Sequence, residues 1–318
     1  MATIKPYEIP LRTTTVLIGM IGITTNGLSL CYFIRKQYNG LGNRLLMLLN
    51  ICDLVVCFTA LTSSILIHSK SSGGVTLYLT SSFIYMVFID CTGFSTCLIS
   101  VTRTIKVCRP FFPIRGVWIA ASFLVYFFGS FSREFVCYYL YFIQPLRDRR
   151  IISKYYPMIF SSGTTLSVVA VFISTIITTH WLLRKNKIRG EVSQTNKHAT
   201  KTILILSTTF CTINLIFVTA ALTSFCVKMG VIKIDEPVME TYKDIVESLT
   251  ISLNSAVNPL IYLSRKKEMR QYFKERAREV LDYFRNNEST EALSLQVASS
   301  RVNGSNYLPQ EEMTDSFQ

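Results

Sequence analysis

The sequence predicts an all-α membrane protein: a seven-transmembrane helix bundle followed by a short amphipathic eighth helix on the inner leaflet. Of its 318 residues, 49% are apolar and only 17% are charged, and the mean hydropathy is +0.34. The chain is therefore too apolar for an ordinary soluble domain and too poor in charge to be disordered. Its apolar stretches run without the alternation of membrane β-strands, as in residues 16–34 and 203–227.

Seven charge-poor stretches follow one another along the chain, at residues 13–34, 45–67, 76–102, 116–132, 155–183, 202–227 and 248–264. Most reach the ~20 residues that a helix needs to cross the hydrocarbon; the fourth and seventh are the shortest. We expect four parts: a short extracellular N-terminus (1–12), the bundle (13–264), an amphipathic juxtamembrane helix (265–285) and a disordered cytoplasmic tail (286–318). The first twelve residues lack the features of a removable signal, so the first stretch is expected to direct insertion.

The distribution of basic residues predicts the orientation. With the N-terminus outside, the cytoplasmic segments hold 22 of the 33 lysines and arginines, as the positive-inside rule requires. One expected outer loop, residues 133–156, departs from the rule by carrying Arg133, Arg147, Arg149, Arg150 and Lys154. We therefore predict a multi-pass plasma-membrane protein with its N-terminus outside.

The segment 265–285 has a helical apolar stripe opposite lysines and arginines, which favours a helix lying against anionic lipid headgroups. The stripe consists of Met269, Tyr272, Phe273, Ala277, Val280, Leu281 and Phe284.

Polar residues at lipid depth predict an internal polar core. The seventh stretch contains Asn254 and ends in Asn258-Pro259-Leu260-Ile261-Tyr262. Hydrocarbon cannot satisfy the amides or the backbone group that a proline leaves open, so these groups must face protein or trapped water. Asp53 lies deep in the second stretch, where a carboxylate is expensive. It is either a structural hydrogen-bonding hub or part of a water-filled cation pocket.

At about 100° per residue, helical projection sorts the third stretch into faces. Tyr85, Ile89 and Thr92 share the face of Arg103, with Tyr85 and Ile89 towards an upper cavity and Thr92 near Asp53. Asp90 points elsewhere, towards the fourth or fifth stretch, where its role is either structural or functional. The expected hydroxyl partners in the fifth stretch are Ser161, Ser162, Thr164, Thr165 and Ser167.

The motifs together resemble rhodopsin-like (class A) G-protein-coupled receptors. The resemblance rests on Asn26, Asp53, Arg103 with Pro110 seven positions later, and Asn258-Pro259-x-x-Tyr262. It covers roughly residues 13–285 and is strong in stretches one, two, three and seven. It implies that Asp53, Thr92, Asn254 and Asn258 surround an allosteric sodium ion, with Asn26 nearby. It also implies that Arg103, Asn258, Pro259 and Tyr262 act in G-protein coupling and activation, and that Tyr85, Ile89, Asn214, Phe217 and Ser248 contact the ligand.

Several positions depart from the pattern of that family. Thr102 and Thr104 replace the acidic residue and the tyrosine beside the arginine, and Asn214 and Ile216 stand where a tryptophan and a proline are expected. The resemblance therefore points to a divergent member, such as an invertebrate chemosensory or peptide-type orphan receptor, or to a receptor with impaired signalling.

Nothing in the sequence indicates an enzyme. Its three histidines fall at separate helix ends, and its nine cysteines form no Cys-x-x-Cys pair; only Cys137 and Cys226 are placed to approach the outer side. Basic residues precede the fifth stretch and acidic residues lie at 235–247. They are either mutual ion pairs or simply solvated charges, or they form a lid that selects charged ligands.

We therefore expect a receptor for an extracellular small molecule or short peptide that activates a heterotrimeric G protein. Arrestin and a kinase are the expected partners of the tail, and membrane lipid surrounds the bundle; no nucleic-acid partner or required cofactor is expected. The competing interpretation is a channel or transporter, in which Asp53, Asp90 and Asn258 line an ion path.

Overall fold

The computed structural model describes residues 8–35, 40–66, 72–109, 111–143, 162–181, 184, 194–234, 236–265, 267–279 and 282. Throughout this part of the chain the regular structure is entirely α-helical. The chain divides into two units, Met1–Arg265 and Lys266–Gln318. The expected cytoplasmic tail, 286–318, lies outside the described residues.

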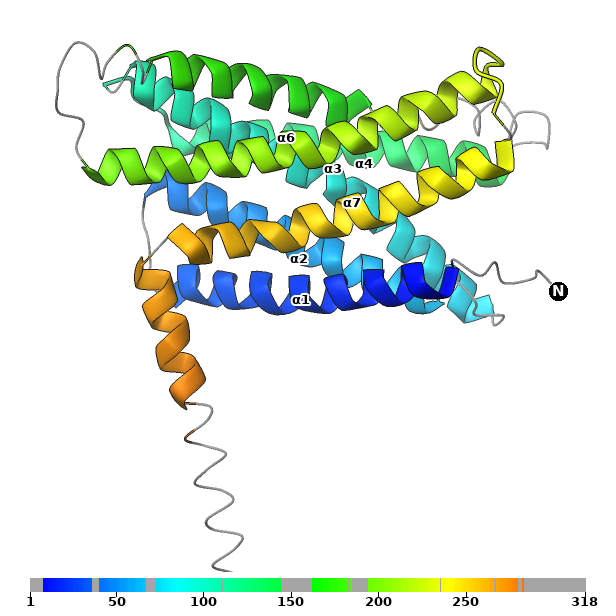
Figure 1. Cartoon of the computed structure of the whole chain (residues 1–318), viewed down its shortest axis with the longest axis horizontal. Helices are drawn as coiled ribbons and strands as arrows, with labels where there is room; N and C mark the ends of the chain where they lie inside the picture. Colours follow the sequence, from blue (N-terminus) through cyan, green and yellow to red (C-terminus); the bar gives the residue numbers. More distant parts are fainter. Residues whose placement is uncertain are drawn as a thin grey trace, which may run out of the picture. The chain divides into compact units, whose positions relative to one another are not determined.

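The first unit is a bundle of long helices that run side by side (Figure 1). Its helices are α1 (Glu8–Arg35), α2 (Leu41–Leu66), α3 (Ser72–Cys108), α4 (Gly116–Ile143), α6 (Gln194–Lys228) and α7 (Glu236–Arg265). A further helix, Ser162–Trp181, lies between α4 and α6 in sequence. The helix α1 begins at Glu8, ahead of the boundary expected at residue 13, although its apolar span does begin at Thr13.

Six of these helices are long and apolar enough to cross a membrane, so the chain is a multi-pass helical membrane protein. The six are α1 to α4, Ser162–Trp181 and α6. The helix α7 is not among them: its first half carries five charged residues, and its second half contains Asn254, Asn258 and Pro259 among several serines. The predicted count of seven spans therefore depends on α7.

The fourth helix corrects the sequence prediction. We expected the fourth stretch to end at residue 132 and Arg133 to belong to an outer loop, whereas α4 continues to Ile143 and its apolar span to Tyr139. Arg133 and Glu134 thus lie inside a spanning helix. The reason is that other groups in the bundle compensate these charges, as described below.

The helix α3 lies at the centre of the bundle, since it packs on α2, α4 and α6. The helix α1 packs on α2 and α7, and α7 also contacts α2 and α6. Gly22 of α1 allows a close approach to α2: a Cβ at this position would overlap the sulfur of Cys57. Gly93 of α3 faces Ser167, which would lie at an ordinary contact distance of 3.5 Å from a Cβ at this position.

Aromatic rings join α3 to α4. Phe94 stacks on Tyr126 with ring centroids 4.1 Å apart, and Phe88 meets Phe127 edge to face at 6.0 Å. Only 11% of the spanning window of α4 is buried, so most of this helix faces outwards from the bundle. Its outer side chains are large and apolar, as lipid contact requires.

Serine and threonine side chains bond to the carbonyl four residues earlier in their own helix, which satisfies hydroxyls at lipid depth without a partner helix. Examples are Thr24 to Met20 (2.9 Å), Thr62 to Phe58 (2.9 Å) and Thr219 to Leu215 (2.8 Å).

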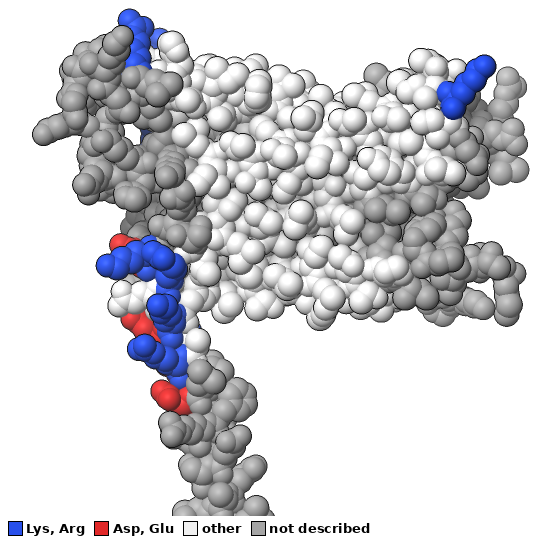
Figure 2. Space-filling model, viewed as in Figure 1, with Lys and Arg blue, Asp and Glu red and all other residues white. Residues whose placement is uncertain are grey.

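Figure 2 shows the face of the bundle as uncharged across its middle, with lysine and arginine only towards its ends.

The second unit contains a helix over residues 267–279. Met269 on the expected apolar stripe is buried and Tyr272 and Phe273 are half-buried, whereas Lys267, Arg270 and Lys274 are exposed. Ala277 departs from the stripe because it is exposed, and the side chains of Val280, Leu281 and Phe284 lie outside the described residues. The helix is thus amphipathic over its first two turns.

Candidate functional site

A fully buried carboxylate joins three helices of the bundle. Asp53 of α2 has no exposed surface. Its Oδ1 accepts a hydrogen bond from the hydroxyl of Thr92 on α3 (3.0 Å), and its Oδ2 accepts one from the amide of Asn258 on α7 (2.7 Å). Ser255 on α7 also interacts with this carboxylate. The predicted proximity of Thr92 to Asp53 is confirmed.

Asn26 connects α1 to the same region by a different route. Its side-chain Nδ2 donates to the carbonyl of Ser255 (3.0 Å) and to that of Gly22 in its own helix (2.9 Å). In a regular helix the Ser255 carbonyl would accept from the backbone N–H four residues later, but that residue is Pro259, which has none. The Asn26 amide therefore supplies the hydrogen bond that the proline removes.

A small cavity, about the size of one water molecule, adjoins this site. Thr92, Asn254 and Ser255 border it on one side, and Asn214 and Ile89 border it on another. Asn254 is also buried, but the α7 amide that bonds to Asp53 is that of Asn258. The cavity thus brings together two residues of the expected sodium pocket, Thr92 and Asn254, and two of the expected ligand contacts, Ile89 and Asn214.

The remaining expected ligand contacts lie around or beyond this cavity. Phe217 is buried in an apolar cluster with Ile89 and Ile251, and Tyr85 packs against the cluster. Asn214 donates to the carbonyl of Phe210 in its own helix (2.9 Å). The side chain of Ser248 lies outside the described residues, as do Arg147, Arg149, Arg150, Lys154 and the acidic side chains of 235–247.

Arg103 borders a second cavity, at the Cys108 end of α3. Thr104 stands where the resemblance predicts a tyrosine. Its hydroxyl bonds to the hydroxyl of Thr178 (2.8 Å). It also donates to the carbonyls of Ser100 (2.9 Å) and Ser174 (3.1 Å). Thr104 thereby ties α3 to the helix Ser162–Trp181 beside the arginine. Pro259 is buried within α7, and the side chain of Tyr262 lies outside the described residues.

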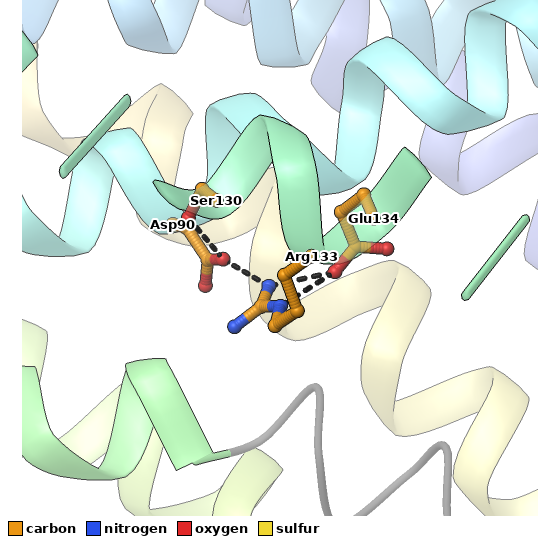
Figure 3. A network of polar contacts seen from close by, with 4 residues as sticks. All are labelled: Asp90, Ser130, Arg133 and Glu134. Carbon is orange, nitrogen blue, oxygen red and sulfur yellow. Dashed lines mark hydrogen bonds and ion pairs between the residues drawn. The ribbon is translucent and has the colours of Figure 1, made fainter. Parts of the chain in front are cut away.

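The partners of Asp90 were predicted incorrectly. The expected hydroxyls lie in residues 161–167, whereas Asp90 is held from α4: Ser130 donates to its Oδ2 (2.8 Å) and the guanidinium of Arg133 pairs with the same oxygen (Figure 3). Arg133 also pairs with Glu134 at 2.7 Å. The predicted direction of Asp90, away from the Arg103 face and towards the fourth or fifth stretch, is confirmed by these α4 contacts, but helical projection does not fix the partner.

The helix Ser162–Trp181 approaches this ionic cluster through Gly163. A Cβ on Gly163 would lie 3.1 Å from Oδ1 of Asp90, 3.1 Å from the hydroxyl of Tyr126 and 3.2 Å from the guanidinium of Arg133. Such distances are tighter than ordinary Cβ contacts. The glycine is therefore what allows this helix to pack on the cluster.

No known family model matches the chain, and no curated protein sequence is detectably similar to it. The arguments for function therefore rest on the residues themselves. Among the described residues, His, Cys, Asp and Glu nowhere gather in a group of three that could hold a metal. The chemistry that the site offers is hydrogen bonding around one carboxylate, together with a guanidinium at the far end of α3.

Proposed function

We propose that the chain is a divergent rhodopsin-like G-protein-coupled receptor in the plasma membrane, with its N-terminus outside and with α7 as the seventh span. It would bind an extracellular small molecule or short peptide and activate a heterotrimeric G protein. The observation that carries the proposal is the bond between Asp53 and Asn258, which joins two parts of the motif set across 205 residues of sequence. The Asn26 bond to Ser255 supports it by joining a third part.

The proposed mechanism is a shift between two helix arrangements, which a ligand biases only if it binds one of them more tightly. Asp53 bonds to α3 and α7 at once, so a relative movement of α7 would change both contacts. Arg103 lies on α3 eleven residues beyond Thr92, about 16 Å along the helix. A displacement of α3 or α6 at that depth would then expose Arg103 to the G protein.

The residues around Asp53 fit an allosteric sodium ion. A carboxylate, two hydroxyls and two amides supply oxygen ligands of the kind that hard cations prefer, and the adjoining cavity provides room beside them. Asp53, Thr92, Ser255, Asn254 and Asn258 are the residues that would hold it. A sodium ion there would stabilise whichever helix arrangement keeps these residues together.

The competing proposal, an ion path through Asp53, Asp90 and Asn258, receives less support. Asp53 is held by α3 and α7, whereas Asp90 is held by Ser130 and Arg133 on α4. The two carboxylates thus belong to separate sites.

A signalling-impaired receptor is the other alternative, because Asn214 and Ile216 replace the expected tryptophan and proline. Half of the surface of Ile216 is exposed, so it faces outwards and not into the bundle. Asn214 borders the cavity and bonds to its own helix. Activation therefore uses the contacts of α3 and α7 and not a bulky side chain at position 214.

The proposal is tested by expressing the full chain in cells that carry reporters for several G-protein classes. Libraries of volatile molecules, small metabolites and short peptides are applied, and surface expression is measured in parallel. A reporter response that depends on both the chain and the added compound supports a receptor. A compound-dependent ion current without any G-protein response would instead support the ion path.

A further inference from the structure

The cavity at the end of α3 has an unusual lining. Apart from Arg103 and the apolar Leu204, the lining residues are all serines and threonines, namely Ser100, Ser174, Thr175, Thr178 and Ser207. They come from α3, from the helix Ser162–Trp181 and from α6. One guanidinium is thus surrounded by five hydroxyls.

The hydroxyls leave donor capacity facing the cavity. Ser100 and Ser207 bond to each other at 3.0 Å, and since either can be the donor, the second hydroxyl of the pair keeps a proton that it can donate elsewhere. Ser174 adds a further hydroxyl to the lining. Thr175 is different because its hydroxyl donates to the carbonyl of Val171 (2.7 Å).

The surrounding helices carry almost no negative charge. The sequence contains no aspartate or glutamate in Ser162–Trp181 or in α6, and the acidic residue of α3 is Asp90. Asp90 lies thirteen residues from Arg103, about 20 Å along the helix. Lys106 and Arg109 follow Arg103 on the same side of the membrane. These three helices therefore place no carboxylate beside the cavity.

We propose that this cavity is a binding site for a phosphate group. A guanidinium with hydroxyl donors and no carboxylate in the lining is the chemistry that recognises a phosphate oxygen. The cavity admits a group about the size of one water molecule, so one oxygen enters and the rest of the phosphate stays at the mouth. Inorganic phosphate in solution and the headgroup of an acidic phospholipid both present such an oxygen. The inference does not depend on the proposed receptor function.

The test uses the full chain, purified and placed in phosphatidylcholine nanodiscs, and measures its thermal unfolding. Inorganic phosphate is titrated at constant ionic strength with chloride as the balancing anion. A ligand that binds only the folded state raises Tm with its concentration. We expect such a rise for the wild type and for Lys106→Gln, and no rise for Arg103→Gln.

The double variant Ser100→Ala with Ser207→Ala is independent of how Arg103→Gln folds. It removes the one proton that this pair can donate to phosphate, and loss of one hydrogen bond to a charged group should weaken phosphate binding about tenfold. A second arm uses nanodiscs that contain phosphatidic acid and no free phosphate. A rise in Tm in this arm that is lost in Arg103→Gln identifies the lipid as the source, and a rise only with inorganic phosphate identifies the free ion. An equal rise in Arg103→Gln, an equal effect of chloride, unchanged affinity in the double serine variant, or no rise in either arm would overturn the proposal.

Discussion

The amide of Asn258 lies 2.7 Å from Oδ2 of Asp53 and fixes α7 against α2 at the depth where Thr92 of α3 holds the other carboxylate oxygen. One buried carboxylate therefore sets the relative positions of three helices. Both of its oxygens accept from neutral donors, so the hydrogen bonds compensate part of the cost of burying it. The predictions below test this core and the packing around it.

The first prediction concerns sodium. If the Asp53 site holds the ion, sodium should raise the Tm of the purified protein relative to N-methylglucamine at equal ionic strength. The stabilisation is about 1.4 kcal/mol when sodium is at tenfold its Kd. Asp53→Asn should abolish this difference, and Asp90→Asn should retain it because Asp90 belongs to the separate cluster on α4. An equal sodium response in wild type and Asp53→Asn would leave Asp53 as a structural hub only.

The second prediction follows from the bond between Asn26 and the Ser255 carbonyl. Asn26→Leu leaves this buried carbonyl without the donor that replaces the missing N–H of Pro259, and should lower the unfolding free energy by about 1–3 kcal/mol. In a Pro259→Ala background the backbone N–H returns, so Asn26→Leu should cost clearly less. Thr62→Ala is the control, since Thr62 is partly exposed and bonds to its own helix. Equal costs of Asn26→Leu in both backgrounds would show that the two residues act independently.

The third prediction concerns the ionic cluster. Arg133→Met leaves the carboxylates of Asp90 and Glu134 uncompensated inside α3 and α4, which should destabilise the protein by about 3–5 kcal/mol. The triple variant Asp90→Asn, Arg133→Met and Glu134→Gln removes all three charges and should recover much of that loss. Thermal unfolding in nanodiscs measures both. A triple variant that is less stable than Arg133→Met would contradict the account.

The sequence alone predicted the core better than the cluster, and the reason is physical. Helical projection places Thr92 on the Arg103 face of α3, and Asp53 has to face the bundle interior because lipid cannot solvate a carboxylate. Arg133 was assigned to a loop because a charge interrupts an apolar stretch, and the pattern along one helix contains no sign of a partner forty-three positions away. The same limit applies to Asn26, whose partner became evident only when α1 was seen to pack on α7 at Pro259.

The fourth prediction tests the close approach of α1 to α2. Gly22→Ala would push a methyl group into the sulfur of Cys57, an overpacking that costs about 1–3 kcal/mol. This exceeds the gain of up to about 1 kcal/mol from placing alanine in a helix. Gly27→Ala on the same helix is the matched control, since nothing lies within 4 Å of its added Cβ. We expect a lower Tm for Gly22→Ala and an unchanged or higher Tm for Gly27→Ala; equal shifts would contradict the packing.

The central claim is that Arg103 passes the state of the bundle to a G protein, and basal signalling tests it most directly. In the family that the chain resembles, an acidic residue and a tyrosine flank this arginine. Thr102 and Thr104 replace them here, so no acidic sequence neighbour restrains Arg103 and we expect basal activity in the wild type. The measurement is the activation of G-protein biosensors without added ligand, plotted against the surface density of the wild type, Arg103→Ala and Lys106→Gln. The account predicts a rising signal for the wild type and Lys106→Gln, and a flat one for Arg103→Ala at equal surface density. The same slope in the wild type and Arg103→Ala, or no slope in any of the three, would contradict it.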